Sequence, residues 1–252
     1  MKLSLCINSA TGQMERPDAI RLAKKLGYPA IEFWEGGSDD FDPAPFKAAI
    51  DETGLAVACM GFARGLVDPA TRPAFLDSVK CSLANAKVLG AKGIIVVTGD
   101  AMDGVSRQAQ HDSIVEGLKE AAKIVDGTGI TLLVEPLNIL VNHAGYYLDK
   151  STEAFEIVRK VNSPCVKVLF DIYHQQISEG NLIANITDNI ELIGHFHIAG
   201  NPGRGEPYLG EINYSEIFAA IEKAGYTGYA GLEYWPKSDV EDSLKKCLEL
   251  YG

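Results

Sequence analysis

Short apolar runs alternate with amphipathic segments along the whole chain. Each run has the length of a strand, and the segment after it repeats apolar residues every three or four positions, as on one face of a helix. We expect eight strands, at residues 2–7, 30–34, 55–61, 93–97, 130–135, 166–170, 192–199 and 228–234. The intervening spacing predicts that a helix follows each strand.

Capping residues indicate where some of these helices begin. Asn213 with Glu216, and Ser238 with Glu241, form capping-box patterns that predict the starts of the last two helices. Between the sixth and seventh strands we expect one helix within residues 177–190.

Eight strand–helix units without neighbouring hairpin strands predict an α/β fold with a parallel sheet, closed as a (β/α)8 TIM barrel. We expect one domain over residues 1–252. An open doubly wound sheet is the alternative, but it usually has a glycine-rich phosphate turn after its first strand, where this chain reads INSATGQ. Lys167 does not fit the pattern, because strict alternation back from Asp171 turns it toward the barrel interior.

Composition and charge exclude several classes of protein. Apolar residues make up 46% and charged residues 23% of the chain, as in ordinary globular proteins. The formal net charge of -11, without a cluster of Lys and Arg, disfavours a nucleic-acid partner. The five cysteines lack paired spacing, and no apolar run reaches membrane-spanning length. We therefore expect a cytoplasmic protein without disulfides or a membrane partner.

Four consecutive predicted strands end in a group that can bind a metal ion: Glu135, Asp171, His197 and Glu233. Singly, such a carboxylate more often caps a helix or faces solvent, and a lone histidine is more often a hydrogen-bonded core residue. Active sites of these barrels lie at the strand ends, however, and three acids meeting there would repel each other without a cation. The donor set favours Mn2+ or Mg2+, with Zn2+ or Co2+ as alternatives.

Five motifs occur in order along the chain: EPLN, DIYH, the GHxH strand, NPGRGEP and GEINY. Together they resemble the hydroxypyruvate isomerase family of the xylose isomerase-like TIM barrels, to which ketose 3-epimerases are related. The resemblance implies that the four strand-end residues bind the metal and that Glu135 and Glu233 also serve as catalytic acid and base. It further implies that His174 and Arg204 hold the oxygens of the substrate.

Two features depart from that family. Its bacterial members often have Gln where this chain has His197 and Asp where it has Gly200, whereas the 3-epimerases have His as the ligand. The substrate is therefore less firmly implied than the reaction class.

Three other residues are weaker candidates for substrate binding. Trp34 and Phe62 lie near the ends of the second and third strands, where they would line the apolar side of a pocket or simply pack. Glu211, in GEINY, is a candidate to bind Arg204 or the substrate, with solvent exposure as the alternative.

The remaining histidines and one tyrosine have less specific expected roles. His195 shares a strand face with His197 one step deeper, which favours a core or supporting hydrogen bond. His143 and Tyr147 lie in the long loop after EPLN and would act as a lid or an oligomer contact. We expect His111, in a polar helix start, at the surface.

These observations predict an isomerase for hydroxypyruvate or a similar small ketose or hydroxy-oxo acid. Its reaction would pass through an enediolate that a divalent cation stabilises while two carboxylates move the proton. Alternatives are a ketose 3-epimerase of the tagatose or allulose type, an inosose dehydratase and, more distantly, an endonuclease IV-like DNA-repair enzyme. That last enzyme would need three zinc ions and a basic groove, which five histidines and a charge of -11 argue against. The expected partner is a small-molecule substrate, and a homo-oligomer is left open.

Overall fold

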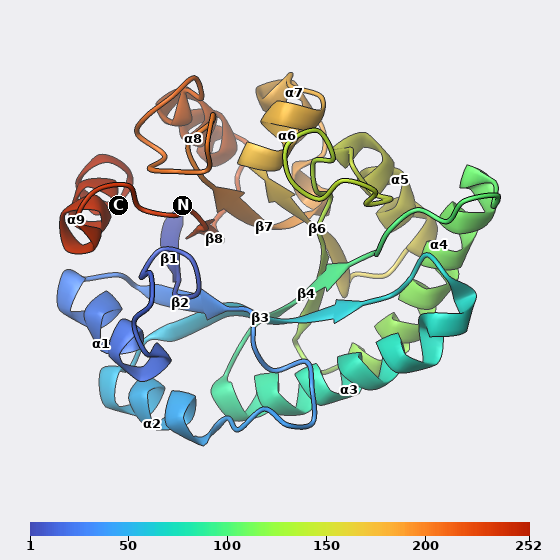
Figure 1. The fold of residues 1–252 in the computed structure, drawn as a ribbon, viewed down its shortest axis with the longest axis horizontal. Helices are drawn as coiled ribbons and strands as arrows, with labels where there is room; N and C mark the ends of the chain where they lie inside the picture. The colour runs from blue at the N-terminus through green and yellow to red at the C-terminus, as the bar shows by residue number, and fades with distance from the viewer.

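Eight parallel strands close into a barrel in the computed structural model, which describes residues 1–252 (Figure 1). Each strand pairs with the next in sequence, and the first pairs with the last. The (β/α)8 prediction is therefore confirmed. The strands are β1 (Lys2–Cys6), β2 (Ala30–Phe33), β3 (Ala56–Arg64), β4 (Gly93–Val97), β5 (Thr131–Val134), β6 (Val166–Asp171), β7 (Ile193–Ile198) and β8 (Tyr229–Leu232).

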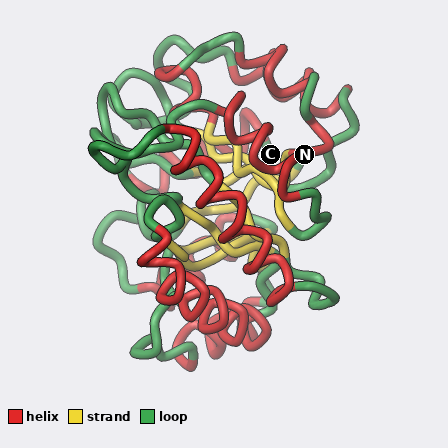
Figure 2. Tube along the Cα trace, turned by 90° about the vertical axis from the view of Figure 1, so that its right-hand side faces the viewer, coloured by secondary structure: helices red, strands yellow, loops and turns green.

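Helices surround the strands, and the two chain ends lie near each other (Figures 1 and 2). The α-helices are α1 (Arg16–Leu26), α2 (Ala44–Thr53), α3 (Arg72–Leu89), α4 (Arg107–Val125), α5 (Ser151–Val161), α6 (Ile172–Ser178), α7 (Leu182–Thr187), α8 (Tyr214–Lys223) and α9 (Val240–Tyr251). Two short 3-10 helices are η1 (Pro69–Thr71) and η2 (Ile190–Leu192). None of the helices is both long and apolar enough to span a bilayer.

The apolar core has two parts. A cluster of 68 buried residues lies mainly where the helices pack on the sheet, and a separate cluster of Cys59, Ile95, Leu133 and Leu169 fills the middle of the barrel. Strand alternation turns Lys167 inward below this cluster, at the start of β6. Its ammonium group donates a hydrogen bond to the backbone carbonyl of Glu191 in η2 at the exposed lower end, so the lysine crosses no apolar layer.

The segment after β6 differs from the single helix expected within residues 177–190. The α6 helix begins directly after the strand, because the Asp171 carboxylate accepts a hydrogen bond from the His174 backbone N–H at 3.1 Å and caps it. A separate helix, α7, then follows. The apolar spacing alone did not reveal a helix that starts on a strand-end carboxylate.

The two capping predictions have different outcomes. Asn213 caps α8 through the backbone N–H of Glu216, as expected. The cap of α9 is Asp239 and not Ser238, because the Ser238 hydroxyl donates to Glu206 instead.

Candidate active site

Four buried side chains converge at the carboxyl ends of β5 to β8. The donor atoms of Glu135, Asp171, His197 and Glu233 all lie within 4.8 Å of one another. His197 Nδ1 lies 3.2 Å from Glu135 Oε1 and 3.4 Å from Glu233 Oε2. The four strand-end residues singled out in the sequence therefore form one cluster.

Strand register places these groups at one level. Asp171, the last residue of β6, pairs with His197 in β7, and His197 pairs with Gly231 in β8. Glu233 follows directly after β8, and its backbone N–H donates to Ile198. Parallel strands in this register bring their carboxyl ends to the same edge of the barrel.

The donor set fits a divalent cation that prefers oxygen. It combines three carboxylates with one imidazole nitrogen and contains no thiol. Buried carboxylates this close raise each other's free energy unless positive charge lies between them. A metal ion bound by these four residues would supply that charge.

Glu32 on β2 contacts both His195 and His197, on the side of His197 away from the three carboxylates. Its Oε1 lies 2.8 Å from His197 Nε2, and its Oε2 lies 2.9 Å from His195 Nε2. The Ser4 hydroxyl donates to the same Oε2 at 2.6 Å. Glu32, His195 and His197 also form a possible metal group with Cys59, but the direct Glu32–histidine contacts occupy the positions that an ion would need.

Gly231 makes room for the Glu32 carboxylate inside the barrel. A Cβ atom at position 231 would lie 2.0 Å from Glu32 Oε1 and 2.5 Å from Oε2. Any side chain there would have to displace Glu32, since real Cβ atoms do not approach oxygen so closely.

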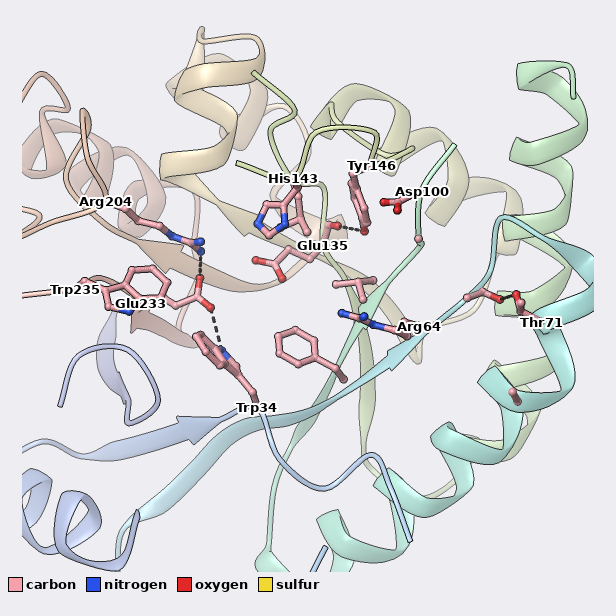
Figure 3. Close-up of a pocket in the computed structure, with 16 residues that line it drawn as sticks. Trp34, Arg64, Thr71, Asp100, Glu135, His143, Tyr146, Arg204, Glu233 and Trp235 are labelled. Atoms are coloured by element: carbon pink, nitrogen blue, oxygen red, sulfur yellow. Dashed lines mark hydrogen bonds and ion pairs between the residues drawn. The ribbon is translucent and has the colours of Figure 1, made fainter. Parts of the chain in front are cut away.

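Glu233 has the strongest partners of the four ligand candidates. The Trp34 indole N–H donates to its Oε1 at 3.0 Å, and the Arg204 guanidinium donates to its Oε2 (Figure 3). Arg204 also lies 3.4 Å from Asp171 Oδ2. Its side chain is 12% exposed, and one nitrogen, Nη2, makes both carboxylate contacts.

The environments separate the pKa values of the two proposed catalytic glutamates. Burial raises the pKa of Glu135 to about 7, against the lowering effect of His197. Burial also acts on Glu233, but Arg204 and His197 outweigh it and lower the pKa of Glu233 to about 2. In the metal-free protein, the two carboxyl groups therefore differ in protonation near neutral pH.

His174 lies beside Asp171 with its ring orientation fixed by Asn138. Its Nδ1 accepts from the Asn138 backbone N–H at 3.2 Å and lies 2.6 Å from the side-chain nitrogen. Two donors at Nδ1 leave the proton on Nε2, which is 3.5 Å from Asp171 Oδ2 and has no hydrogen-bond partner. Burial and Arg204 lower the pKa of His174 well below its usual value, which keeps the ring neutral.

A cavity of about 700 Å³ opens above the cluster (Figure 3). Glu135, Glu233 and Arg204 reach its surface. Tyr146 holds the backbone of Glu135 in place by donating to its carbonyl at 3.0 Å. The other lining residues are Trp34, Phe62, Arg64, Gly65, Thr71, Ala74, Val97, Gly99, Asp100, Leu137, His143, Tyr146 and Trp235.

Several secondary candidates lie in the cavity wall and others do not. Trp34, Phe62 and His143 line the cavity. Glu211 is exposed, does not line it, and accepts hydrogen bonds from Asn201 and Gln176 instead.

The remaining candidates have structural partners. His195 supports Glu32, which agrees with its expected supporting role. Tyr147 is buried and donates to Glu153, so it is not placed as an exposed lid. The surface prediction for His111 is wrong: the ring is buried between Glu153 and Lys160, because its helix packs against α5.

Sequence reasoning missed Glu32, Arg64 and Asn138. Glu32 lies in the apolar run AIEFW. A charged residue within a buried strand was the only sign in the sequence that Glu32 has a function. Asn138 was visible in EPLN, but nothing in the sequence connected it with His174.

Comparison with known proteins decides the family. The family model described as xylose isomerase-like TIM barrel matches residues 20–250. The chain belongs to this family.

Two relatives of this xylose isomerase-like barrel are isomerases. Hydroxypyruvate isomerase of Escherichia coli (strain K12) is 37% identical over 177 residues, which cover 70% of this chain and 68% of that protein. A 2-oxo-tetronate isomerase of Cupriavidus necator is 32% identical over 239 residues, 90% of each chain. The xylose isomerase-like barrel described here is an enzyme of the isomerase class.

A solved structure from Brucella melitensis described as AP endonuclease, family 2, superposes with a TM-score of 0.92. It is 28% identical in sequence, and the match covers 99% of both chains. The two proteins thus share the backbone fold over nearly their whole lengths.

Replacing Trp34 with Phe tests the hydrogen bond to Glu233. The variant keeps an aromatic ring against Phe62 but leaves a buried charged acceptor without one of its donors. We expect the free energy of unfolding, measured by denaturant titration of the metal-free protein, to fall by about 1.5 to 3 kcal/mol.

Trp235→Phe is the matched control. The ring of Trp235 packs against that of Trp34, with 6.2 Å between the ring centroids. Trp235 is 43% exposed, and its indole N–H makes no hydrogen bond. We expect a loss below about 1 kcal/mol for this variant. Equal losses in the two variants would show that ring volume, and not the hydrogen bond, determines the effect.

Proposed function

We propose that this chain is a divalent-metal-dependent isomerase of a small hydroxy-oxo acid, such as hydroxypyruvate or 2-oxo-tetronate. The observation that carries the proposal is the set of four donor atoms within 4.8 Å of one another beneath a cavity that two of the same residues line. The names of the relatives support the substrate class.

Glu135 and Glu233 have the positions that a proton transfer between neighbouring carbons requires. They follow β5 and β8, three strands apart around the barrel, and both reach the cavity. One carboxylate removes the proton from the hydroxyl-bearing carbon next to the substrate carbonyl, and a proton is returned to the former carbonyl carbon. The hydroxyl proton passes to the former carbonyl oxygen. The product has the same atoms as the substrate, with carbonyl and hydroxyl exchanged.

Other residues hold the substrate while the proton moves. A divalent cation bound by the four ligands would supply Lewis-acid stabilisation of the negative charge that develops on the carbonyl oxygen. The Nε2–H of His174 has no partner and donates to a substrate oxygen near Asp171. Arg204 keeps Glu233 ionised and oriented. Mn2+ and Mg2+ suit the donor set best, with Zn2+ and Co2+ as alternatives.

The epimerase alternative uses the same residues and differs only in where the proton returns. Return to the same carbon from the opposite face is epimerisation, and return to the neighbouring carbon is isomerisation. The 37% and 32% identical relatives, both isomerases by name, favour isomerisation. A DNA-repair activity is disfavoured by the net charge of -11.

Solvent deuterium tests the reaction directly. The purified protein is stripped of metal with a chelator, reloaded with Mn2+ and incubated with hydroxypyruvate, 2-oxo-tetronate or a neutral ketose in deuterium oxide. We expect deuterium only with the metal restored, located by NMR on the hydroxyl-bearing carbon next to the carbonyl in the substrate and on the former carbonyl carbon in the product. Lack of uptake with every substrate would overturn the proposed function, and label confined to one epimerised carbon would favour the epimerase.

Glu135→Gln and Glu233→Gln test the acid and base. Each variant keeps the size of the side chain but removes the proton acceptor, so we expect kcat to fall about 10² to 10⁴-fold. Glu156→Gln, at an exposed position of α5, makes the same chemical change away from the cavity and should keep wild-type kcat. Circular dichroism checks the fold, and a kcat within severalfold of wild type would remove that glutamate from the mechanism.

A further inference from the structure

Arg64 differs from every other arginine of the chain. Of the seven arginines, five pair with carboxylates and Arg159 donates to Asn189, whereas Arg64 forms neither a hydrogen bond nor an ion pair. Its side chain is exposed at the cavity, into which it points in Figure 3. Asp100 lines the same cavity but does not pair with it.

A bulge in β3 turns Arg64 toward the cavity. Strict alternation from Cys59, which faces the barrel interior, would place residues 61 and 63 inside and Arg64 outside. At Gly61, with φ of +72°, the register with β4 shifts by one residue. Beyond the shift, Arg64 pairs with Val97, which lines the cavity, and Ala63 is buried in the outer core.

Arg204 is the other arginine of this cavity, but its positive charge is already offset by two carboxylates. Its Nη2 contacts both Asp171 and Glu233, although its Nε has no partner. An arginine without a partner, in a cavity whose opposite wall is acidic, retains its full capacity for a bidentate contact with a carboxylate.

We propose that Arg64 binds the carboxylate of the substrate and thereby selects an oxo acid over a neutral ketose. The proposal rests on the proposed function for the position of the reacting carbons. The substrate then extends across the cavity, with its carbonyl and hydroxyl toward Glu135 and Glu233 and its carboxylate toward β3.

A matched pair of substrates tests this selection. 2-Oxo-tetronate and erythrulose differ only at C1, which is a carboxylate in the first and a hydroxymethyl group in the second. Deuterium uptake at C3 gives kcat/KM for both compounds, since carbonyl transfer from C2 to C3 turns erythrulose into erythrulose again. We expect Arg64→Gln to lower the ratio of kcat/KM for the acid to kcat/KM for the ketose about tenfold or more, mainly by raising KM of the acid. Arg64→Lys should give an intermediate ratio, because it retains the charge without the planar guanidinium.

Arg21→Gln is the control, since it removes the same charge from the outer face of α1. Its ratio should equal that of the wild type. An unchanged ratio in Arg64→Gln, or an equal fall in the control, would overturn the assignment of Arg64.

Calorimetric binding to the Mn2+-loaded protein separates this proposal from the isomerase itself. Binding of 2-oxo-tetronate that weakens in Arg64→Gln, without deuterium exchange, would support Arg64 and refute the isomerase. Turnover of the acid by Arg64→Gln with wild-type KM would support the isomerase and refute the assignment of Arg64. Failure of the wild type to bind 2-oxo-tetronate would refute both.

The contacts of Glu32 carry a second, independent inference. The carboxylate is 1% exposed, and its Oε1 lies 2.8 Å from Nε2 of His197 as an ion-pair contact, while neither atom forms a hydrogen bond with any other group. His195 and Ser4 hold the second oxygen in place. The other nitrogen of His197 faces Glu135 and Glu233.

We infer that Glu32 is a positioning residue for the metal site. Through this 2.8 Å contact, the negative charge of Glu32 favours a proton on Nε2 of His197 and so leaves the Nδ1 lone pair facing the three carboxylates. A ring with the proton on Nδ1 would present N–H to a cation and could not bind it.

The affinity for Mn2+ tests Glu32 without any assay of turnover. We expect Glu32→Ala to raise the dissociation constant, measured from the EPR signal of free Mn2+, about 10 to 100-fold. Glu32→Gln should weaken binding less than Glu32→Ala, because its amide oxygen keeps partial negative charge beside Nε2 of His197. Gly231→Ala should weaken Mn2+ binding as Glu32→Ala does. In this variant Glu32 is still present, but the new Cβ displaces its carboxylate from His197.

Ile95→Val, in the apolar cluster of the barrel interior, is the control for loss of packing and should keep the wild-type affinity. Wild-type affinity in folded Glu32→Ala would overturn the inference. If that variant does not fold, nitrogen NMR of the wild type loaded with diamagnetic Mg2+ decides: a proton on Nε2 of His197 supports the inference, and an Nε2 without a proton refutes it.

Discussion

Burial of like charge is the constraint on which the upper half of this barrel depends. Glu32, Glu135, Asp171 and Glu233 are each at most 4% exposed, and isolated ions buried to this degree would be unstable. His195, His197 and Arg204 provide the compensating groups within the chain. The indole donor of Trp34, the cap at α6 and the space at Gly231 can each be understood as part of this compensation.

The interior of the barrel is divided into an apolar layer and an ionic layer. Cys59, Ile95, Leu133 and Leu169 form the apolar layer, and the carboxylates and histidines lie next to it toward the carboxyl ends. The apolar layer separates the charges from the lower end, where Lys167 reaches the exterior. Buried charges are thus confined to the one end of the barrel that a cation or a substrate can enter.

The alternation of strands and helices in the sequence was sufficient to predict the residues of the site that lie at strand ends. Glu135, Asp171, His197 and Glu233 each end an apolar run, and parallel strands bring such ends together. Arg64 could not be found in this way, because one extra residue at Gly61 reverses the faces of the strand beyond it.

Contacts between distant strands were equally hidden in the sequence. The Glu32 carboxylate occupies space that any side chain at position 231 would fill, and Glu32 and Gly231 are far apart in the chain. Likewise, α6 starts early because Asp171 is both the last residue of β6 and the N-cap of the helix. A pattern of apolar residues gives no sign of this second role.

The two oxygens of Asp171 have separate tasks, and this limits how the enzyme can diverge. Oδ1 caps α6 while Oδ2 faces Arg204, so replacing Asp171 would remove both the start of a helix and a partner of Arg204. On the opposite wall, Arg64 and Asp100 contribute to no helix cap or ion pair. Substitutions in β3 and in the loop after β4 therefore disturb fewer structural contacts than substitutions at the carboxyl ends of β5 to β8.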